Sequence, residues 1–345
     1  MKPSPTWGNG PFHQSQLGDF CKCMKYGYLK YVLGLKPKWR NAKMVLGSAA
    51  HVILYDLHDG EDRVFDIGWI LQRAYEAEFN LNPDYPGDEK IPVFWKDGRD
   101  KMVNAWAVDF LKTLEVYWSK PWNRECEILL AEAKFEVMIG PFKFAGRIDQ
   151  LRRYTKSYEF ENIQIEAGEI HLNDFKTGES KITPGLLELG YQPSIYAWGL
   201  LHGSFIEDSK KQPNFGGTKW NVDKICLYRT MDHLPYKKRT VVKLTGEIHE
   251  VGDERGPGMY LTTRCDKDFE AMITDLGYKC RQIVGPHYGT NKLVKGGAFA
   301  REISYQNGTV ICDTCDMLQE CLADRHQANI DTTNITISEE DIVNV

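Results

Sequence analysis

The stretch Glu169-Ile-His-Leu-Asn-Asp174-Phe-Lys176-Thr-Gly178, taken with Gly146-Arg-Ile-Asp149 earlier in the chain, decides the fold we expect. Each piece reads as a β-strand with a carboxylate near its end. Because side chains alternate between the faces of a strand, Asp174 and Lys176 share one face and Phe175 points into a core. Two carboxylates and an ammonium group on neighbouring strands suit a metal-dependent phosphodiesterase, whose acids hold a hard cation while the lysine faces the phosphate.

Asp-x-Lys alone is more often a solvated surface pair, but its surroundings favour a site. Tyr191-Gln192-Pro-Ser-Ile-Tyr196 opens an apolar stretch that predicts a helix, and Gln192 and Tyr196 lie on one face of it. Upstream, Gly47-Ser-Ala-Ala-His51 leads into another predicted helix through Leu57. A histidine on an apolar helix is usually a core or surface residue, so His51 alone does not identify a site.

The order of these residues resembles the RecB-type branch of the PD-(D/E)XK nucleases, which includes AddB and the CRISPR-associated iron–sulfur exonucleases. The resemblance runs from about Ser15 to Cys321 and rests on His51, Glu132, Asp149, Asp174-x-Lys176 and Gln192-x3-Tyr196. It implies an α/β fold with a restriction-endonuclease-like core, in which a central mixed β-sheet is flanked by helices. The amino- and carboxyl-terminal ends would be joined by a cysteine metal cluster.

The same resemblance implies roles for the site residues. One or two Mg²⁺ or Mn²⁺ ions would be bound by His51, Asp149, Asp174 and the carbonyl of Phe175. Lys176 would orient the attacking water or neutralise the phosphate, and Gln192 and Tyr196 would position Lys176 and the DNA backbone. Glu132 matches an acidic position of the family, and the alternative for it is a strand-edge carboxylate that faces solvent.

The cysteine pattern is the second specific signal. Cys312-Asp-Thr-Cys315-Asp-Met-Leu-Gln-Glu-Cys321 can supply three of the four thiolates that a [4Fe–4S] cluster requires. Structural Zn²⁺ suits four thiolates equally well, and three thiols without a metal are the remaining alternative. The resemblance implies the cluster, with a fourth ligand from the amino-terminal helix. It favours Cys23 there, although the usual proline is Met24 and Cys21 stays open as the alternative ligand.

Composition restricts the class of protein. The chain has 345 residues, 42% of them hydrophobic, and a net charge of −5, which disfavours binding of duplex DNA by bulk electrostatics. No apolar run approaches the roughly 20 residues that span a bilayer, and the first residues lack a signal peptide. An odd number of cysteines then favours a reducing, cytoplasmic compartment. The lysines and tyrosines between Lys22 and Lys43 suit either a single-strand channel or a solvated basic helix.

The chain is divided by composition into segments that we expect to form one structural unit. They are an amino-terminal helical region with the cluster cysteine and His51 (1–58), a helical insertion (59–118), the nuclease core (119–245), a carboxyl-terminal helical region with the cysteine cluster (246–325) and an acidic tail (326–345). Within the core, strands are predicted over 128–136, 143–151 and 169–176.

The function predicted from the sequence is metal-dependent hydrolysis of DNA. We expect an exonuclease that acts on single-stranded ends in DNA recombination, repair or phage DNA metabolism. The alternatives are a non-catalytic module that binds DNA ends within a recombination or helicase complex, and a structural iron–sulfur or zinc protein. Since the chain has no Walker A motif, unwinding would have to come from a helicase or recombination partner.

Overall fold

The computed structural model divides the chain into two compact units, Met1–Trp39 with Gly277–Val345 and Arg40–Leu276. The residues that the structure describes are 10–35, 39–59, 66–79, 91–160, 163–177, 182–206, 219–229, 239–242, 248–251, 258–284, 305–306 and 309–310. The segment boundaries given above remain predictions.

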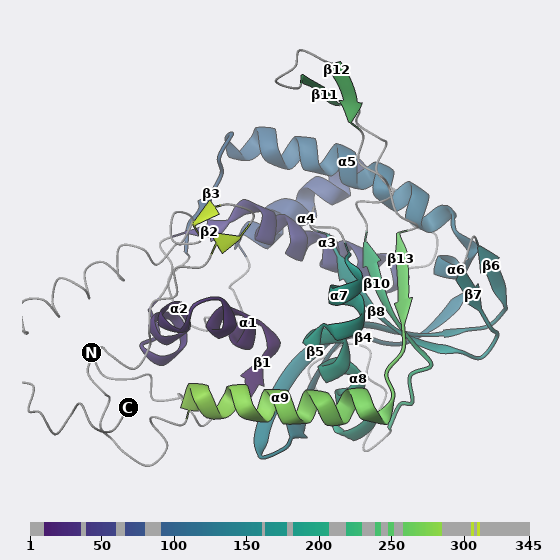
Figure 1. The fold of residues 1–345 in the computed structure, drawn as a ribbon. Coiled ribbons are helices and arrows are strands. Elements are labelled where there is room, and N and C mark those ends of the chain that lie inside the picture. The colour runs from purple at the N-terminus through teal and green to yellow at the C-terminus, as the bar shows by residue number, and fades with distance from the viewer. Residues whose placement is uncertain are drawn as a thin grey trace, which may run out of the picture. The chain divides into compact units, whose positions relative to one another are not determined.

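A mixed sheet organises the larger unit, with the strand order β13-β10-β8-β5-β4-β9 (Figure 1). Its strands are β4 (Cys126–Ile139), β5 (Phe142–Tyr154), β8 (Ile170–Lys176), β9 (Ser204–Phe205), β10 (Lys224–Arg229) and β13 (Met259–Thr262). Strands β8 and β10 are parallel, and the other pairs in this order are antiparallel. This confirms the predicted mixed sheet, and a parallel pair needs the crossover that the helices after β8 supply.

The burial of each strand explains its sequence. Strands β4 and β5 form a long hairpin, turned at Gly140 with φ +57°, and buried and less buried residues largely alternate along them. Strand β8 is buried at almost every position because helices cover both of its faces. The carboxylate of Asp174 is therefore held in the interior, where water screens charges weakly.

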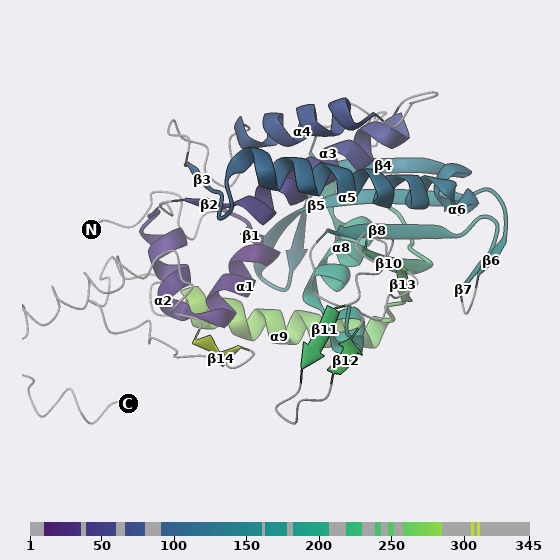
Figure 2. The same ribbon diagram turned by 90° about the horizontal axis from the view of Figure 1, so that it is seen from above.

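Three helices cover one face of this sheet, and α8 (Tyr191–His202) covers the other (Figure 2). The three are α3 (Ala42–Asp59), α4 (Ile67–Phe79) and α5 (Arg99–Ser119). The Asn41 carboxamide accepts the N–H of Lys43 at 2.9 Å in the first turn of α3. On the face of the sheet that α3, α4 and α5 cover, Leu54 and Tyr117 share one apolar core with Phe175 and Tyr228 of the sheet. Phe175 points into this core, as predicted.

Two glycines, one on α8 and one on β5, make room for a single phenylalanine where the helix packs on the sheet. A Cβ atom at Gly199 of α8 would lie 2.2 Å from the ring of Phe135 on β4, and one at Gly146 of β5 would lie 2.7 Å from the same ring. A larger residue at either position would push the helix away. The contact fixes α8, and with it Gln192 and Tyr196, above β5 and β8.

A fully buried arginine lies on the opposite face of the sheet. The guanidinium of Arg152 donates to Gln150 Oε1 at 2.7 Å, Asn123 Oδ1 at 2.8 Å and the Tyr117 hydroxyl at 2.5 Å. It also lies 5.9 Å from the centre of the Phe175 ring. These partners are uncharged, so hydrogen bonds and aromatic rings rather than a carboxylate compensate the loss of hydration.

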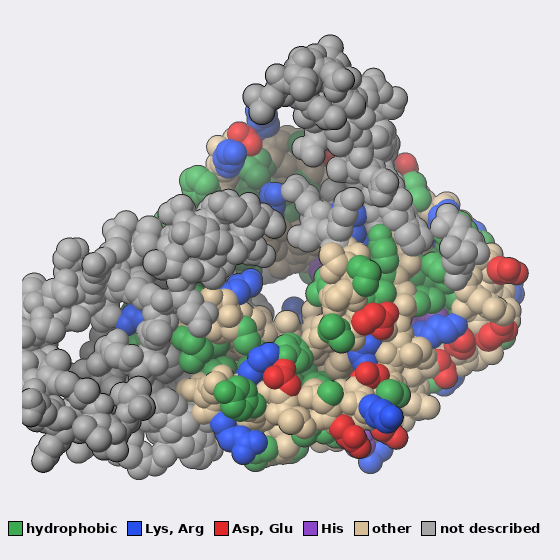
Figure 3. Space-filling view, viewed as in Figure 1, with side chains coloured by type: hydrophobic (Ala, Val, Ile, Leu, Met, Phe, Trp, Pro, Cys, Tyr) green, Lys and Arg blue, Asp and Glu red, His purple; other side chains and the backbone are tan. Residues whose placement is uncertain are grey.

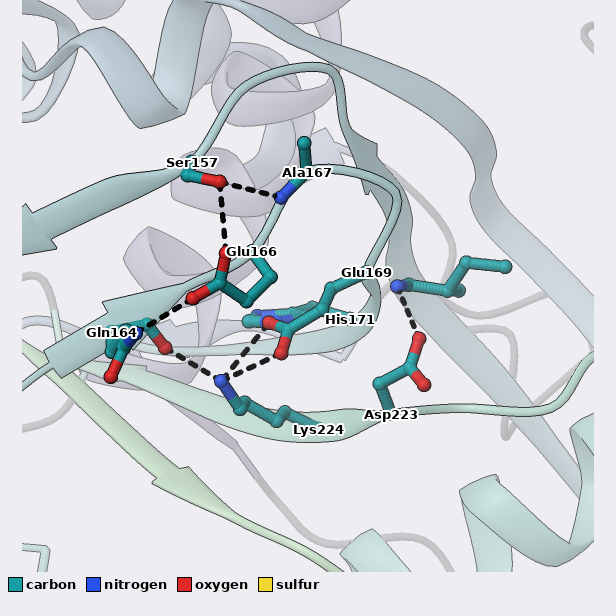
Figure 4. Close-up of polar contacts among 9 residues, drawn as sticks. Ser157, Gln164, Glu166, Ala167, Glu169, His171, Asp223 and Lys224 are labelled. Atoms are coloured by element: carbon teal, nitrogen blue, oxygen red, sulfur yellow. Dashed lines mark hydrogen bonds and ion pairs between the residues drawn. The ribbon is translucent and has the colours of Figure 1, made fainter.

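The amino-terminal end of β8 carries a polar cluster of its own (Figure 4). Glu169 Oε2 lies 2.8 Å from Nε2 of the buried His171, and Glu169 Oε1 lies 2.9 Å from Lys224 Nζ. Lys224 also donates to the carbonyl of Gln164 at 2.6 Å. This cluster ties β8 to β10 and to the hairpin of β6 (Tyr158–Phe160) and β7 (Ile163–Ile165), at the end of the strand remote from Asp174.

The remaining elements are short or peripheral. In the larger unit they are β2 (Arg40–Asn41), β3 (Val93–Phe94), α6 (Pro121–Arg124), α7 (Pro184–Leu189), β11 (Arg239–Val242) and β12 (Ile248–Val251). The smaller unit contains β1 (Phe12–His13), α1 (Gln14–Lys22), α2 (Met24–Gly27), the π-helical η1 (Tyr28–Val32), β14 (Tyr305–Gln306) and β15 (Thr309–Val310). Helix α9 (Asp266–Val284) belongs partly to each unit. No helix in the described part of the chain is long and apolar enough to cross a membrane.

Candidate metal centre and active site

Three of the predicted site residues bring their donor atoms together at the sheet. His51 comes from α3, Glu132 from β4 and Asp149 from β5, and one ligand atom of each lies within 4.8 Å of the others. His51 Nδ1 is 3.5 Å from Asp149 Oδ1 and 3.8 Å from Glu132 Oε1. One imidazole nitrogen with carboxylate oxygens is a donor set that suits Mn²⁺ or Mg²⁺.

The electrostatics of this group favour a cation between its members. Burial lowers the pKa of His51, but the carboxylates of Asp149 and Glu132 outweigh it and raise that pKa to about 10. Burial by itself raises the pKa of Asp149. The opposing effects of His51, the N–H of Phe175 and Lys176 are larger and bring this pKa below its ordinary value. Without a metal, the positive charge that balances the acids is a proton on His51, and a divalent ion can replace that proton.

The second half of the site centres on Gln192 of α8. Its Nε2 group donates to Asp174 Oδ1 at 3.0 Å and to the Tyr196 hydroxyl at 3.3 Å, and its Oε1 accepts from Lys176 Nζ at 2.8 Å. Lys176 Nζ also forms an ion pair with Asp174 Oδ2. The amide therefore holds an acid and a lysine side by side, and its orientation is fixed because each end meets a group of the required polarity.

The two halves adjoin through Asp149 and the residues around Asp174. Asp149 Oδ2 accepts the backbone N–H of Phe175 at 2.8 Å, which ties β5 to β8 at the site. Burial and the neighbouring Asp149 raise the pKa of Asp174 to about 6, against the opposing effect of Lys176. Among the described residues, the compact group of donor atoms comprises His51, Glu132 and Asp149, and Asp174 lies beside it rather than within it.

The surface around the fold carries mixed charge. In Figure 3, acidic and basic side chains are interspersed over the described surface near β6 and β7. In the smaller unit, Lys30 Nζ pairs with Asp19 Oδ2 at 2.9 Å and lies over the rings of Tyr26 and Tyr31. Lys25 is buried and lies over Tyr28. These two lysines are engaged within the unit, so they support neither the predicted single-strand channel nor the solvated basic face.

The cysteines that the structure describes differ in their surroundings. Cys23 joins α1 to α2 and its Sγ accepts the N–H of Tyr26 at 3.5 Å, whereas Cys21 is exposed. The predicted ligands Cys312, Cys315 and Cys321 lie outside the described residues. Of the other described thiols, Cys226 and Cys280 are buried.

Comparison with known proteins agrees with the geometry. A sequence model of the PD-(D/E)XK nuclease superfamily matches residues 11–321, which covers most of the chain. The chain belongs to this superfamily. A search of curated proteins found no match. Members of the superfamily are metal-dependent nucleases that hydrolyse DNA with Mg²⁺ or Mn²⁺, and the group formed by His51, Glu132 and Asp149 can hold such an ion.

The structure brings every described residue of the predicted nuclease site into two adjoining groups. It adds Arg147, whose Nε lies 3.1 Å from Glu132 Oε2. Arg147 stands two residues before Asp149 on β5, so the alternation of side chains places both on one face. The spacing of Arg147 and Asp149 is the one signal in the sequence that could have identified this arginine.

Proposed function

We propose that this protein is a metal-dependent DNA exonuclease of the RecB/AddB-like branch that acts on single-stranded ends. The observation that carries the proposal is the pairing of Lys176 with Gln192 and Asp174 directly beside the group of metal-binding atoms. A structural protein has no need of a buried acid and a lysine held together beside such a group. A hydrolase needs both, because the phosphate gains negative charge as the bond breaks.

The metal would be held by His51, Asp149, Asp174 and the carbonyl of Phe175. When bound, the divalent ion supplies charge stabilisation at the phosphate and makes a nearby water more acidic. Asp149 has a second task, since its Oδ2 accepts the Phe175 N–H and so sets the direction of the chain at that carbonyl. The core contacts of the Phe175 ring with Tyr117 and Tyr228 hold the same residue from the other side.

Lys176 would orient the attacking water or neutralise the phosphate. Gln192 accepts a hydrogen bond from the ammonium group of Lys176, and Asp174 forms an ion pair with the same group. The lysine is therefore oriented before the substrate binds. A group held in place in advance loses little entropy in the transition state. Tyr196 would act through Gln192, to whose Nε2 its hydroxyl is hydrogen-bonded, and would contact the DNA backbone rather than the reacting atoms.

We also propose that Cys23, Cys312, Cys315 and Cys321 bind a [4Fe–4S] cluster that is structural. One observation supports it: Cys23 Sγ accepts the backbone N–H of Tyr26, and hydrogen bonds to sulfur are typical of ligating thiolates. Cys21 is the alternative fourth ligand, and Zn²⁺ is the alternative metal. Hydrolysis needs no redox step, so the cluster would stabilise the fold.

One assay tests the proposed activity. Single- and double-stranded DNA labelled at one end is incubated with the protein and Mg²⁺ or Mn²⁺, and the products are resolved by length. We expect single-stranded DNA to be shortened progressively from an end and Lys176→Ala to be inactive. The same substitution at Lys112, which is exposed on α5, should leave the rate unchanged. Internal cuts would show that the enzyme is an endonuclease. Binding of DNA without cleavage would show that the protein is a non-catalytic DNA-end-binding module.

A further inference from the structure

Glu132 has a backbone conformation that its sequence does not explain. Strand β4 pairs Ala131 with Gln150 and Ala133 with Ile148, and Glu132 between them has φ +50°. Among the described residues it is the one non-glycine residue with positive φ. A left-handed conformation costs a residue with a side chain roughly 1–2 kcal/mol, so something must hold Glu132 there.

The carboxylate of Glu132 connects two basic groups. Its Oε1 lies 3.8 Å from His51 Nδ1, and its Oε2 lies 3.1 Å from Arg147 Nε. One oxygen therefore faces the group of metal-binding atoms while the other is held by an arginine on the neighbouring strand. The side chain of Glu132 is 23% exposed and that of Arg147 is 52% exposed, so water reaches this ion pair.

Arg147 belongs to the site and not to a remote part of the surface. It shares a face of β5 with Asp149, and its charge partly offsets the rise in the pKa of Tyr196 that burial and the nearby acids cause. An ion pair with this exposure contributes only about 0–1 kcal/mol to stability. That is less than the cost of the left-handed backbone at Glu132, so the pair does not exist for stability alone.

We propose that Arg147 is a positioning residue that holds Glu132 as a further ligand of the metal, in addition to those proposed above. By occupying Oε2, Arg147 directs Oε1 towards the position that His51 and Asp149 share. Metal-binding carboxylates commonly receive such a hydrogen bond from outside the coordination shell, and losing it costs about 10–100-fold in metal affinity. The inference rests on the proposed metal centre of the nuclease and does not require that DNA be cleaved.

The test is calorimetric titration of Mn²⁺ into the full-length protein, freed of divalent ions and without DNA. Arg147→Ala and Glu132→Gln should each weaken Mn²⁺ binding about 10–100-fold, and the double variant should be no weaker than the worse single variant. Arg147→Lys should restore part of the affinity. Arg153→Ala is the matched control. Arg153 forms an ion pair with Glu127, 3.0 Å long, across the same two strands, and this pair lies away from the site. It should stay within about twofold of the original protein.

The outcomes separate this inference from the proposed function. If Arg147→Ala binds Mn²⁺ as Arg153→Ala does, or if the two site substitutions add, Arg147 does not position Glu132. Unchanged Mn²⁺ affinity with weaker binding of an oligonucleotide would make Arg147 a substrate contact and overturn the inference. Thermal unfolding of each variant shows whether it is folded. A protein whose Mn²⁺ affinity follows these expectations but which cleaves no DNA would retain the inference and lose the nuclease.

Discussion

A Cβ atom at Gly146 would lie 2.9 Å from Cε1 of Tyr196, so β5 and α8 touch where glycine alone fits without a shift. Gly146→Ala should therefore move the tyrosine and the helix that carries Gln192. We expect cleavage to fall by about 10–100-fold, since small displacements are costly at a preorganised site, while stability falls by about 1–3 kcal/mol. Cleavage rates and urea unfolding measure the two effects.

The control for this substitution is Gly185→Ala on α7, where an added Cβ would meet no atom within 4 Å. It should leave the cleavage rate unchanged and should not lower stability, since alanine in place of a helical glycine adds about 0.4–1 kcal/mol. If Gly146→Ala retained full activity, the close approach of the strand and helix would have no role in placing Gln192.

Lys176→Ala should abolish cleavage and leave binding of metal and DNA largely intact, because the lysine faces the phosphate rather than the ion. Asp149→Ala and Asp174→Ala should lose Mn²⁺ affinity together with activity, since both acids are proposed ligands. Single-turnover cleavage and Mn²⁺ titration separate the two classes. A Lys176→Ala protein that cleaves at nearly the original rate would show that the proposed site is wrong.

Anaerobically purified protein should be brown, with broad absorption at about 400 nm from a [4Fe–4S] cluster. Replacing Cys23, Cys312, Cys315 or Cys321 by serine should remove the colour and lower solubility, because a metal that joins chain ends stabilises the fold directly. Cys21→Ser, at an exposed position, should be tolerated. A colourless protein with one zinc would exclude the cluster, and colour lost with Cys21 but not with Cys23 would transfer the fourth ligand.

His171 should make folding sensitive to acid. Burial lowers its pKa to about 4, and Glu169 offsets only part of that effect, whereas in the unfolded chain the pKa has its ordinary value of about 6.5. Between these values the unfolded state binds more protons, so this contribution is complete above about pH 6.5 and is lost as the pH falls towards 4. Its slope is at most about 1.4 kcal/mol per pH unit.

Urea unfolding at several pH values tests this linkage. His171→Gln should flatten the fall in the free energy of unfolding between pH 6.5 and 4, while His202→Gln, at an exposed position, should change it less. An equally steep fall in the His171 variant would assign the acid sensitivity to other groups. Asp174 works in the opposite direction, since its pKa is raised to about 6, so the comparison must be between variants.

The strands of the core could be predicted because their patterns are strong. The predicted strands over 128–136, 143–151 and 169–176 are confirmed by β4, β5 and β8, whose side chains alternate or are buried on both faces. The superfamily and the mixed sheet also followed from the motifs. The match over residues 11–321 confirms the superfamily, and the strand pairing confirms the sheet, whereas the RecB/AddB-like branch remains a prediction. The exonuclease activity on single-stranded ends, the metal ligands and the cysteine cluster remain predictions.

Other features could not be read from the sequence for physical reasons. Glutamate is not a residue that favours positive φ, so nothing local marks the conformation of Glu132. A charged residue in a strand is normally exposed, and the burial of Arg152 depends on acceptors from α5 and α6 in addition to Gln150 of its own strand. Both features depend on contacts between distant segments, which local patterns do not record.

The buried guanidinium of Arg152 also restricts the order in which the chain can fold. Its acceptors Tyr117 and Asn123 stand earlier in the chain, so both leave the ribosome before Arg152 does. If β5 were desolvated before those groups had docked, an unsolvated cation would be left in apolar surroundings at a cost of several kcal/mol. Strand β5 is therefore expected to join the sheet only after α5 and α6 have formed. In nascent chains, residues 99–124 should become resistant to proteolysis before β5 pairs in the sheet.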